Sequence, residues 1–223
     1  RGLISTTNNY PNTAQVAGAR GVYRDLPLHF FLERYVESYR AEMVAFVART
    51  ADSHKGDYGR VLIVAGSRGK TGAAHLAAVG ALRSGAGLVT IATPASCQPV
   101  LAVMAPEYMT EALQEADGGL AIDEIDRVLE MARDVIAIGP GLGQAAATRN
   151  FIQQIVDRAT MPLVIDADGL NAFASAPDRL TGREGRDIII TPHPGEMARL
   201  VGMSTHEVQA HRLEIARNFA SGH

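Results

Sequence analysis

The sequence has 223 residues, of which 47% are hydrophobic and 20% charged, and its formal net charge is −3. A chain of this length buries about 70% of its unfolded surface, which excludes a disordered chain and removes the need for disulfides or a structural metal. The small acidic excess argues against nucleic acid as a partner, and no run of ~18 apolar residues predicts a membrane span. Cys97 is the single cysteine, so we expect a cytoplasmic protein. Because the first residue is Arg1 and not Met, we also expect a part of something longer.

Residues 1–50 differ in composition from the rest, which predicts a boundary between a segment 1–50 and a domain 51–223. The segment holds seven of the twelve aromatic residues, and its 18–23 stretch predicts a short strand. Residues 30–47 predict an amphipathic helix whose apolar side chains form one stripe. Its polar face mixes acids with arginine, so we interpret it as core-facing and not as a membrane-surface helix.

The first segment also resembles a known family. The stretches "NNYPNT" and "GVYRDLPLHFFLERYVESYRAEMVAFV" are similar to the C-terminal segment of inositol 2-dehydrogenase-like oxidoreductases. That family's nicotinamide-binding turn and its catalytic lysine and histidine belong to earlier parts of its sequence. The resemblance therefore implies no dehydrogenase activity here.

From residue 51 onward, short Val/Ile runs alternate with helix-like stretches, which predicts repeated βα units and a mainly parallel sheet. The predicted strands are 60–66, 87–92, 108–113, 134–138, 162–166 and 187–191. The predicted helices are 71–85, 95–103, 122–131, 146–157, 169–174, 194–201 and 205–220. The last helix begins with Ser204 and Glu207 at the spacing of a capping box.

The turn at 66–72 follows a buried-looking strand and opens a helix, where free backbone N–H groups suit a phosphate. A P-loop needs four residues between its first glycine and Gly-Lys-Thr, but Gly66 leaves only two. Two interpretations stay open. The glycines serve only a tight turn, or the turn lies beside an anion or nucleotide.

A second glycine cluster, Gly139, Gly141 and Gly143, ends another strand and would let a ligand approach the backbone. Next, the apolar run 163–165 leads directly into Asp166 and Asp168. Ligands of open α/β sheets bind at the carboxyl ends of strands, so these two carboxylates are placed to meet a polar substrate or Mg²⁺. The alternative for Asp168 is a helix N-cap.

His193 lies between two prolines at the end of the last predicted strand. A backbone restricted from both sides can hold an imidazole against a ligand. We interpret Glu196 as a helix first-turn acid and Cys97 as a small hydrophobic residue.

Together these turns resemble one family. The stretches "HKGDYGRVLIVAGS", "TGAAHLAAVGALRSGAGLVTIATP", "AIGPGLGQ", "VIDADGLNAF" and "ITPHPGEMARLVG" are similar to NAD(P)H-hydrate dehydratases over about residues 53–219. The resemblance implies an α/β, ribokinase-like three-layer sandwich. It also implies that ADP or ATP, with Mg²⁺, drives removal of water from hydrated NADH or NADPH, by phosphorylation of the ring hydroxyl and elimination.

Carried over residue by residue, the resemblance implies contacts of this chain with the dinucleotide and the nucleoside phosphate. The residues assigned to the hydrated dinucleotide are Ala73, Gly141, Gly143, Asp166, Asn171 and His193. Gly139 and Asp168 are assigned to the nucleoside phosphate, and no residue is assigned to catalysis or to a metal.

The family continues with a "GTGD"-type loop whose aspartate is the base, and no such run occurs in these 223 residues. We therefore expect this chain by itself to turn over poorly. We also expect an unpaired sheet edge after 187–191, and hence a homo-oligomer. A non-catalytic chimera with residual nucleotide binding and a small-molecule kinase on the same fold stay open as alternatives.

Overall fold

A computed structural model describes residues 49–116 and 119–223 of the chain. The strand predicted at 18–23 and the helix predicted at 30–47 lie outside these residues, so both stay predictions. Residues 54–223 fall within one compact unit. Among the described helices none is both long enough and apolar enough to cross a membrane.

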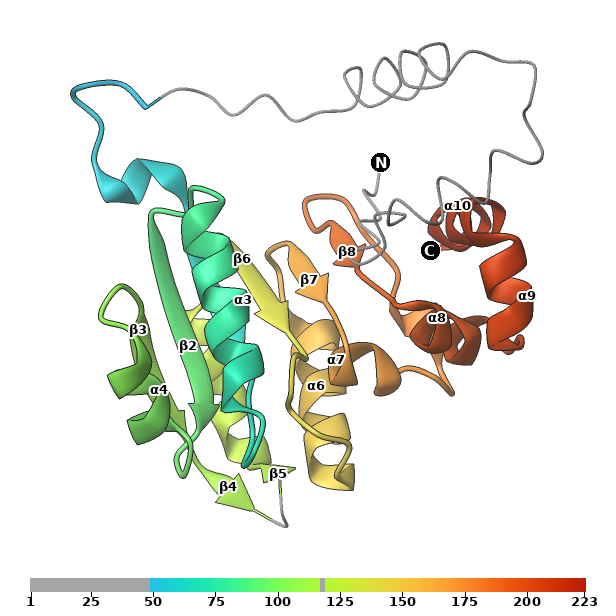
Figure 1. The fold of residues 1–223 in the computed structure, drawn as a ribbon, viewed down its shortest axis with the longest axis horizontal. Helices are drawn as coiled ribbons and strands as arrows, with labels where there is room; N and C mark the ends of the chain where they lie inside the picture. The colour runs from blue at the N-terminus through green and yellow to red at the C-terminus, as the bar shows by residue number, and fades with distance from the viewer. Residues whose placement is uncertain (1–48, 117–118) are drawn as a thin grey trace, which may run out of the picture. The chain divides into compact units, whose positions relative to one another are not determined.

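Six strands form one parallel sheet, which confirms the predicted α/β class (Figure 1). The spatial order is β3-β2-β1-β6-β7-β8. The central strands are short apolar runs, as expected for strands that are covered by helices, whereas the edge strand β3 contains Thr110 and Glu111. Their bounds are β1 Arg60–Val64, β2 Leu88–Pro94, β3 Met109–Leu113, β6 Val135–Ile138, β7 Leu163–Ile165 and β8 Ile188–Ile190.

Helices connect these strands, and most begin and end within a few residues of the predicted positions. The α-helices are α3 Thr71–Arg83, α4 Gln98–Met104, α5 Ile125–Met131, α6 Ala146–Arg158, α7 Asp168–Asn171, α8 Pro194–Val201, α9 Thr205–Ala210 and α10 Arg212–Gly222. The 3-10 turns are η1 Lys55–Tyr58, η2 Ile122–Glu124 and η3 Pro177–Arg179. A two-stranded hairpin, β4 Glu115–Ala116 with β5 Gly119–Leu120, was not predicted.

The prediction of a single helix over 205–220 is wrong, because the structure has two helices there, α9 and α10. His211 between them has φ −129° and ψ 34°, outside the helical region, and so ends α9 and starts α10. The predicted capping box at the start of α9 is confirmed. The Ser204 hydroxyl accepts from the Glu207 N–H at 3.2 Å, and the Glu207 carboxylate accepts from the Ser204 N–H at 2.9 Å.

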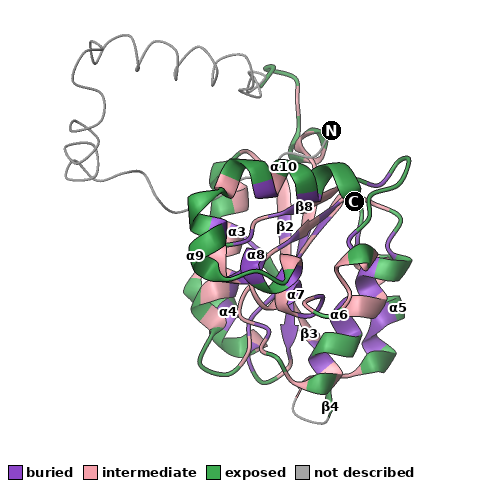
Figure 2. Ribbon diagram, turned by 90° about the vertical axis from the view of Figure 1, so that its right-hand side faces the viewer, coloured by how far each residue is buried: buried purple, intermediate pink, exposed green. Residues whose placement is uncertain are grey.

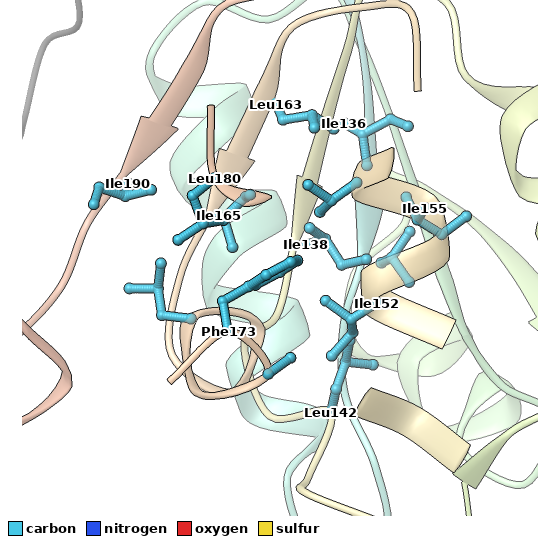
Figure 3. Close-up of a cluster of buried hydrophobic side chains, with 14 of the residues drawn as sticks. Ile136, Ile138, Leu142, Ile152, Ile155, Leu163, Ile165, Phe173, Leu180 and Ile190 are labelled. Atoms are coloured by element: carbon cyan, nitrogen blue, oxygen red, sulfur yellow. The ribbon is translucent and has the colours of Figure 1, made fainter. Parts of the chain in front are cut away.

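The two faces of the sheet bury different side chains, which produces three layers (Figure 2). Leu62 and Val64 of β1 point to the side of α5 and α6, where Phe151 is fully buried. Ile63 of β1 points to the other side, against α3 and α4. This alternation follows from the two-residue period of a strand. Figure 3 shows part of the larger core, which joins α6 to β6, β7 and β8.

The strand order changes direction between β1 and β6. From β1 the chain runs outward through β2 and β3, then returns to β6 on the other side and runs outward to β8. The connections after β1 and β6 therefore leave toward opposite faces of the sheet. In open α/β sheets, ligands bind in the crevice at the carboxyl ends of the strands at such a switch point.

Candidate functional site

Two glycine-rich turns meet at the switch point. The turn after β1 is joined to the turn after β6 by the Gly66 N–H, which donates to the Pro140 carbonyl at 2.8 Å. The Ser67 hydroxyl donates to the Gly141 carbonyl at 2.6 Å. A Cβ on Gly141 would lie 2.9 Å from the Lys70 carbonyl oxygen, closer than real Cβ atoms come. Glycine is thus needed for the two turns to pack together.

The helices that follow these turns begin without side-chain caps. The N-cap residue of α3 is Lys70 and that of α6 is Ala145, and neither side chain bonds to the first-turn amides. Free first-turn amides and the positive end of the helix dipole suit a phosphate. Gly66 and Gly69 have φ of 86° and 77°, as a tight turn requires, and both interpretations of the 66–72 segment stay open. The anion remains a prediction.

Asp168 ties the turn after β7 to the turn after β6. Its Oδ2 accepts from the Gly143 N–H at 2.8 Å and lies 3.5 Å from Lys70 Nζ. Its Oδ1 accepts from the Gln144 amide at 3.3 Å. Burial acts to raise the pKa of Asp168, but these hydrogen bonds and the lysine charge outweigh it and leave the pKa below its ordinary value.

The alternative that Asp168 is an N-cap is wrong. Ala167 is the N-cap residue of α7, with φ 52° and ψ −119°, and Asp168 is the first helical residue. A non-glycine residue with positive φ is uncommon and strained. Asp168 thus begins α7, and its carboxylate bonds to the Gly143 amide and not to its own helix's cap position.

Gly139 and Gly143 lie in the same turn but serve different purposes. A Cβ on Gly139 would lie 1.9 Å from the Asp166 carbonyl oxygen and 2.6 Å from the Gly169 nitrogen. The absence of a side chain at Gly139 therefore lets the backbone of the turn after β7 pack against the turn after β6. A Cβ on Gly143 would meet no atom within 4 Å, although its φ is 84°. Gly143 thus leaves open space beside its amide.

Ala73 and Gly141, both assigned from the resemblance to the dinucleotide, lie side by side. A Cβ on Gly141 would be 3.0 Å from the Cβ of Ala73. The Asn171 side-chain oxygen accepts from Arg199 Nε at 2.8 Å, which connects α7 to α8. The Asp166 carboxylate makes no side-chain hydrogen bond within the described part of the chain.

His193 is the N-cap of α8. Its Nδ1 accepts from the Gly195 N–H at 3.0 Å and from the Glu196 N–H at 3.3 Å, while the Glu196 carboxylate accepts from the His193 N–H at 2.8 Å. The interpretation of Glu196 as a first-turn acid is confirmed. The His193 side chain is 59% exposed, so a ligand can reach it.

Sequence reasoning missed several polar side chains of the site. Lys70 faces Asp168, Ser67 holds the two glycine turns together, and Gln144 and Arg199 bond to predicted site residues. The available signal was the Gly-Lys-Thr run at the start of α3. The spacing excludes a P-loop, but Lys70 still lies in the turn that follows a parallel strand and could have been predicted as a site residue on that ground.

The described residues contain no group of three or more His, Cys, Asp or Glu side chains that could hold a metal ion. Mg²⁺ is commonly held by one or two carboxylates together with substrate phosphates, and it keeps several waters. The Asp166 carboxylate, which is without a side-chain hydrogen bond among the described residues, fits that mode of binding.

A hollow of about 310 Å³ lies at the opposite end of the sheet, where β1, β2 and β3 begin. Arg60, Leu88, Met109 and Arg133 are among the residues that line it. None of the predicted site residues does so. The candidate site is therefore placed by the strand ends and the two interlocked turns.

A family model for NAD(P)H-hydrate dehydratase matches residues 61–222, which include every residue of this site. The chain belongs to the NAD(P)H-hydrate dehydratase family. Over 175 residues it is 49% identical to the bifunctional NAD(P)H-hydrate repair enzyme of Moorella thermoacetica, covering 77% of this chain and 33% of that protein. Over 194 residues it is 36% identical to the ADP-dependent (S)-NAD(P)H-hydrate dehydratase of Bacillus subtilis, covering 86% of this chain and 63% of that protein. The chain thus spans less than two thirds of the length of these relatives.

Solved structures of a dehydratase and of a ribokinase-like superfamily protein have the same fold. The ADP/ATP-dependent NAD(P)H-hydrate dehydratase of Bacillus subtilis, co-crystallised with ATP and Mg²⁺, has a TM-score of 0.62 and 33% identity, over 78% of this chain and 58% of that one. A ribokinase-like superfamily protein of Enterococcus faecalis has a TM-score of 0.59 and 28% identity, over 72% of this chain and 54% of that one. The predicted ribokinase-like fold is confirmed.

Proposed function

We propose that this chain binds hydrated NADH or NADPH and a nucleoside phosphate, ADP or ATP, as part of an enzyme that removes water from the hydrated nicotinamide ring. Membership of the dehydratase family supports this function. The printed names of its relatives, an ADP-dependent dehydratase and a repair enzyme for NAD(P)H hydrate, support the substrate and the nucleotide.

The observation that carries the proposal is the pair of interlocked turns at the β1/β6 switch point. The turns are joined by the Gly66–Pro140 and Ser67–Gly141 hydrogen bonds, and each opens a helix without a side-chain cap. Two uncapped helix ends beside glycine backbone form a site for the phosphates of a dinucleotide or nucleotide. Lys70 adds a positive charge there.

In the proposed reaction, the ring hydroxyl loses its proton to a base and takes the terminal phosphate of the nucleotide, which leaves as the nucleotide one phosphate shorter. The C–O bond then breaks, phosphate leaves, and the neighbouring ring carbon loses a proton to form the ring double bond. Bound Mg²⁺ would supply neutralisation of the phosphate charge. The backbone amides of the two turns hold the phosphates, and Asp168 keeps the Gly143 turn in place. The sequence contains no Gly-Thr-Gly-Asp run, and we propose that the base which deprotonates the ring hydroxyl is not among these 223 residues.

Calorimetric titration of hydrated NADH into the chain tests the proposal. Gly141→Ala should weaken binding about tenfold or more, because its Cβ would press on the Lys70 carbonyl and separate the two turns. Gly185→Ala is the matched control. Gly185 also has positive φ, 76°, and open space around it, but it lies between η3 and β8.

The proposal would be contradicted if the folded wild-type chain did not bind hydrated NADH. It would also be contradicted if Gly141→Ala and Gly185→Ala bound hydrated NADH with equal affinity. With hydrated NADH, ADP and Mg²⁺ present, we expect little recovery of absorbance at the NADH band. Turnover at the rate of a complete enzyme would contradict the assignment of the base to residues outside this sequence. Transfer of phosphate to a small alcohol without loss of water would favour the small-molecule kinase instead.

The other expectations stay predictions. These are a homo-oligomer, a cytoplasmic location, the boundary near residue 50 and the resemblance of residues 1–50 to a dehydrogenase C-terminal segment. The non-catalytic chimera also stays an alternative; it would retain at most nucleotide binding and would show no turnover.

A further inference from the structure

Both ring nitrogens of His193 are engaged by helix α8. Nδ1 accepts hydrogen bonds from two amides, those of Gly195 and Glu196, at 3.0 and 3.3 Å. A nitrogen that accepts from N–H groups carries no proton, so the proton of the neutral ring lies on Nε2. Nε2 lies 3.1 Å from Glu196 Oε1, which is an electrostatic contact of the ring with the carboxylate. The geometry thus selects one tautomer.

Glu196 holds His193 at two points. Its Oε2 accepts from the His193 backbone N–H at 2.8 Å, and its Oε1 faces the ring at 3.1 Å. The Glu196 side chain is only 6% exposed, so water cannot easily replace the backbone hydrogen bond or the contact with the ring. Burial raises the pKa of Glu196 above its ordinary value, and this effect outweighs the bond from His193; Asp166 also raises it, while Arg199 lowers it.

Gly195 is the residue that lets the ring lie over the first turn of α8. A Cβ on Gly195 would lie 2.9 Å from His193 Cε1 and 3.3 Å from Nδ1. Any side chain there would push the imidazole away from its capping position. The glycine and the glutamate therefore hold the ring from two sides.

We propose that Glu196 is a positioning residue that holds the His193 imidazole in its neutral, Nε2-protonated tautomer, so that the ring meets the ligand as a fixed, uncharged surface and not as a proton carrier. Contact of His193 with the hydrated dinucleotide rests on the proposed function. The tautomer and its dependence on Glu196 do not rest on it.

Long-range ¹H–¹⁵N correlation spectra of the chain with ¹⁵N-labelled histidine report the tautomer directly. We expect the wild-type signals of His193 to be those of a ring protonated at Nε2. In Glu196→Gln, the side-chain NH₂ group faces either the ring Nε2 or the His193 backbone N–H, so one of the two contacts with His193 is lost. The His193 ring should then populate a mixture of tautomers. Gly195→Ala should have the same effect while Glu196 is retained.

Glu207→Gln is the matched control, because Glu207 occupies the same third position in the capping box of α9. It should leave the His193 signals unchanged. A wild-type ring protonated at Nδ1 would overturn the inference, and so would unchanged His193 signals in folded Glu196→Gln and Gly195→Ala. Circular dichroism identifies a variant that fails to fold. If one of Glu196→Gln and Gly195→Ala does not fold, the His193 signals of the other variant test the inference.

Titration with hydrated NADH connects the tautomer to binding. We expect Glu196→Gln and Gly195→Ala to weaken binding by about three- to tenfold and Glu207→Gln to leave it unchanged. Wild-type affinity in both variants, with an altered tautomer, would overturn the part of the inference that concerns the ligand. Absence of binding by the wild-type chain, with the expected tautomer, would contradict the proposed function and leave the positioning role of Glu196 standing.

Discussion

Asp168 joins three parts of the candidate site: the turn after β6, the turn after β7 and Lys70 before α3. The bond to the Gly143 amide, at 2.8 Å, is a charge-assisted one and is shielded from water on one side. Gly143 has open space beside it, so a side-chain bond and not packing determines where its amide points. The site therefore depends on this carboxylate being ionised.

We predict that Asp168→Asn lowers the free energy of unfolding by about 1 kcal/mol at pH 7, because the amide loses the charge-assisted bonds. The pKa of Asp168 is lowered from 3.8 in the folded chain. Its stabilisation is therefore complete above that ordinary value and is lost as pH falls through the lower folded pKa. Urea unfolding across this pH range measures the difference.

Asp123→Asn serves as the control for Asp168→Asn, because Asp123 is exposed and lies in η2, away from the site. Its effect should be small at every pH. A wild-type advantage over Asp168→Asn that did not shrink at all as the pH fell below 3.8 would contradict the assigned role of the charge.

The residues of the site were predictable to different degrees. The predicted strand ends correctly put four residues at one edge of the sheet, because the carboxyl ends of parallel strands share an edge. These residues are Gly139, Gly141, Asp166 and His193. The partners of these residues were not predictable, because they come from elsewhere in the chain. The Gly143–Asp168 bond, for instance, joins residues that are 25 positions apart.

The turn after β6 is the element on which the site depends most. Its glycines at 139, 141 and 143 all have positive φ, but only the first two are surrounded by close atoms. Gly139 fixes the distance between the β6 and β7 turns, Gly141 fixes the approach to α3, and the Gly143 amide bonds to Asp168 of the β7 turn. One short segment thus sets the spacing of three neighbouring strands' ends.

We predict that Gly139→Ala lowers the free energy of unfolding by about 3 kcal/mol or more, because its Cβ would lie 1.9 Å from a backbone oxygen that cannot move easily. Gly143→Ala is the control and should cost about 1 kcal/mol, since it carries the cost of positive φ without a clash. Guanidinium unfolding measures both. Equal losses would contradict the structure of this turn.

The pattern of hydrophobic residues and the turn residues that flank it predicted the six strands and most helices. The short elements were not predicted. Two-residue strands such as β4 have no measurable period, and the break at His211 has no glycine or proline to mark it. Both features are decided by tertiary packing. The capping boxes, in contrast, are local and were visible at Ser204 in the sequence.

At the scale of the whole molecule, the two halves of the sheet are covered differently. On one face of the sheet, β1 and β2 pack against α3 and α4 (Figure 1). Val164 of β7 and Ile189 of β8 belong to neither core of the described residues. Within those residues β8 pairs with β7 alone. An apolar edge strand of this kind favours association with another chain.

We predict that the chain self-associates and that Ile189→Lys weakens this association by about tenfold, because a charge on an edge strand opposes pairing. Sedimentation velocity over a range of concentrations measures it. Leu213→Lys is the control, since Leu213 is a 62% exposed residue of α10. A wild-type monomer at every concentration would contradict the prediction.

The account as a whole rests on the position of the ligand at the β1/β6 switch point. Mapping of backbone amide signals during titration with hydrated NADH tests this most directly. We predict that the shifted amides lie in the turns at 66–73 and 139–144 and extend to the starts of α7 and α8. Shifts confined to the hollow at the opposite end of the sheet, around Arg60, Leu88 and Met109, would contradict it.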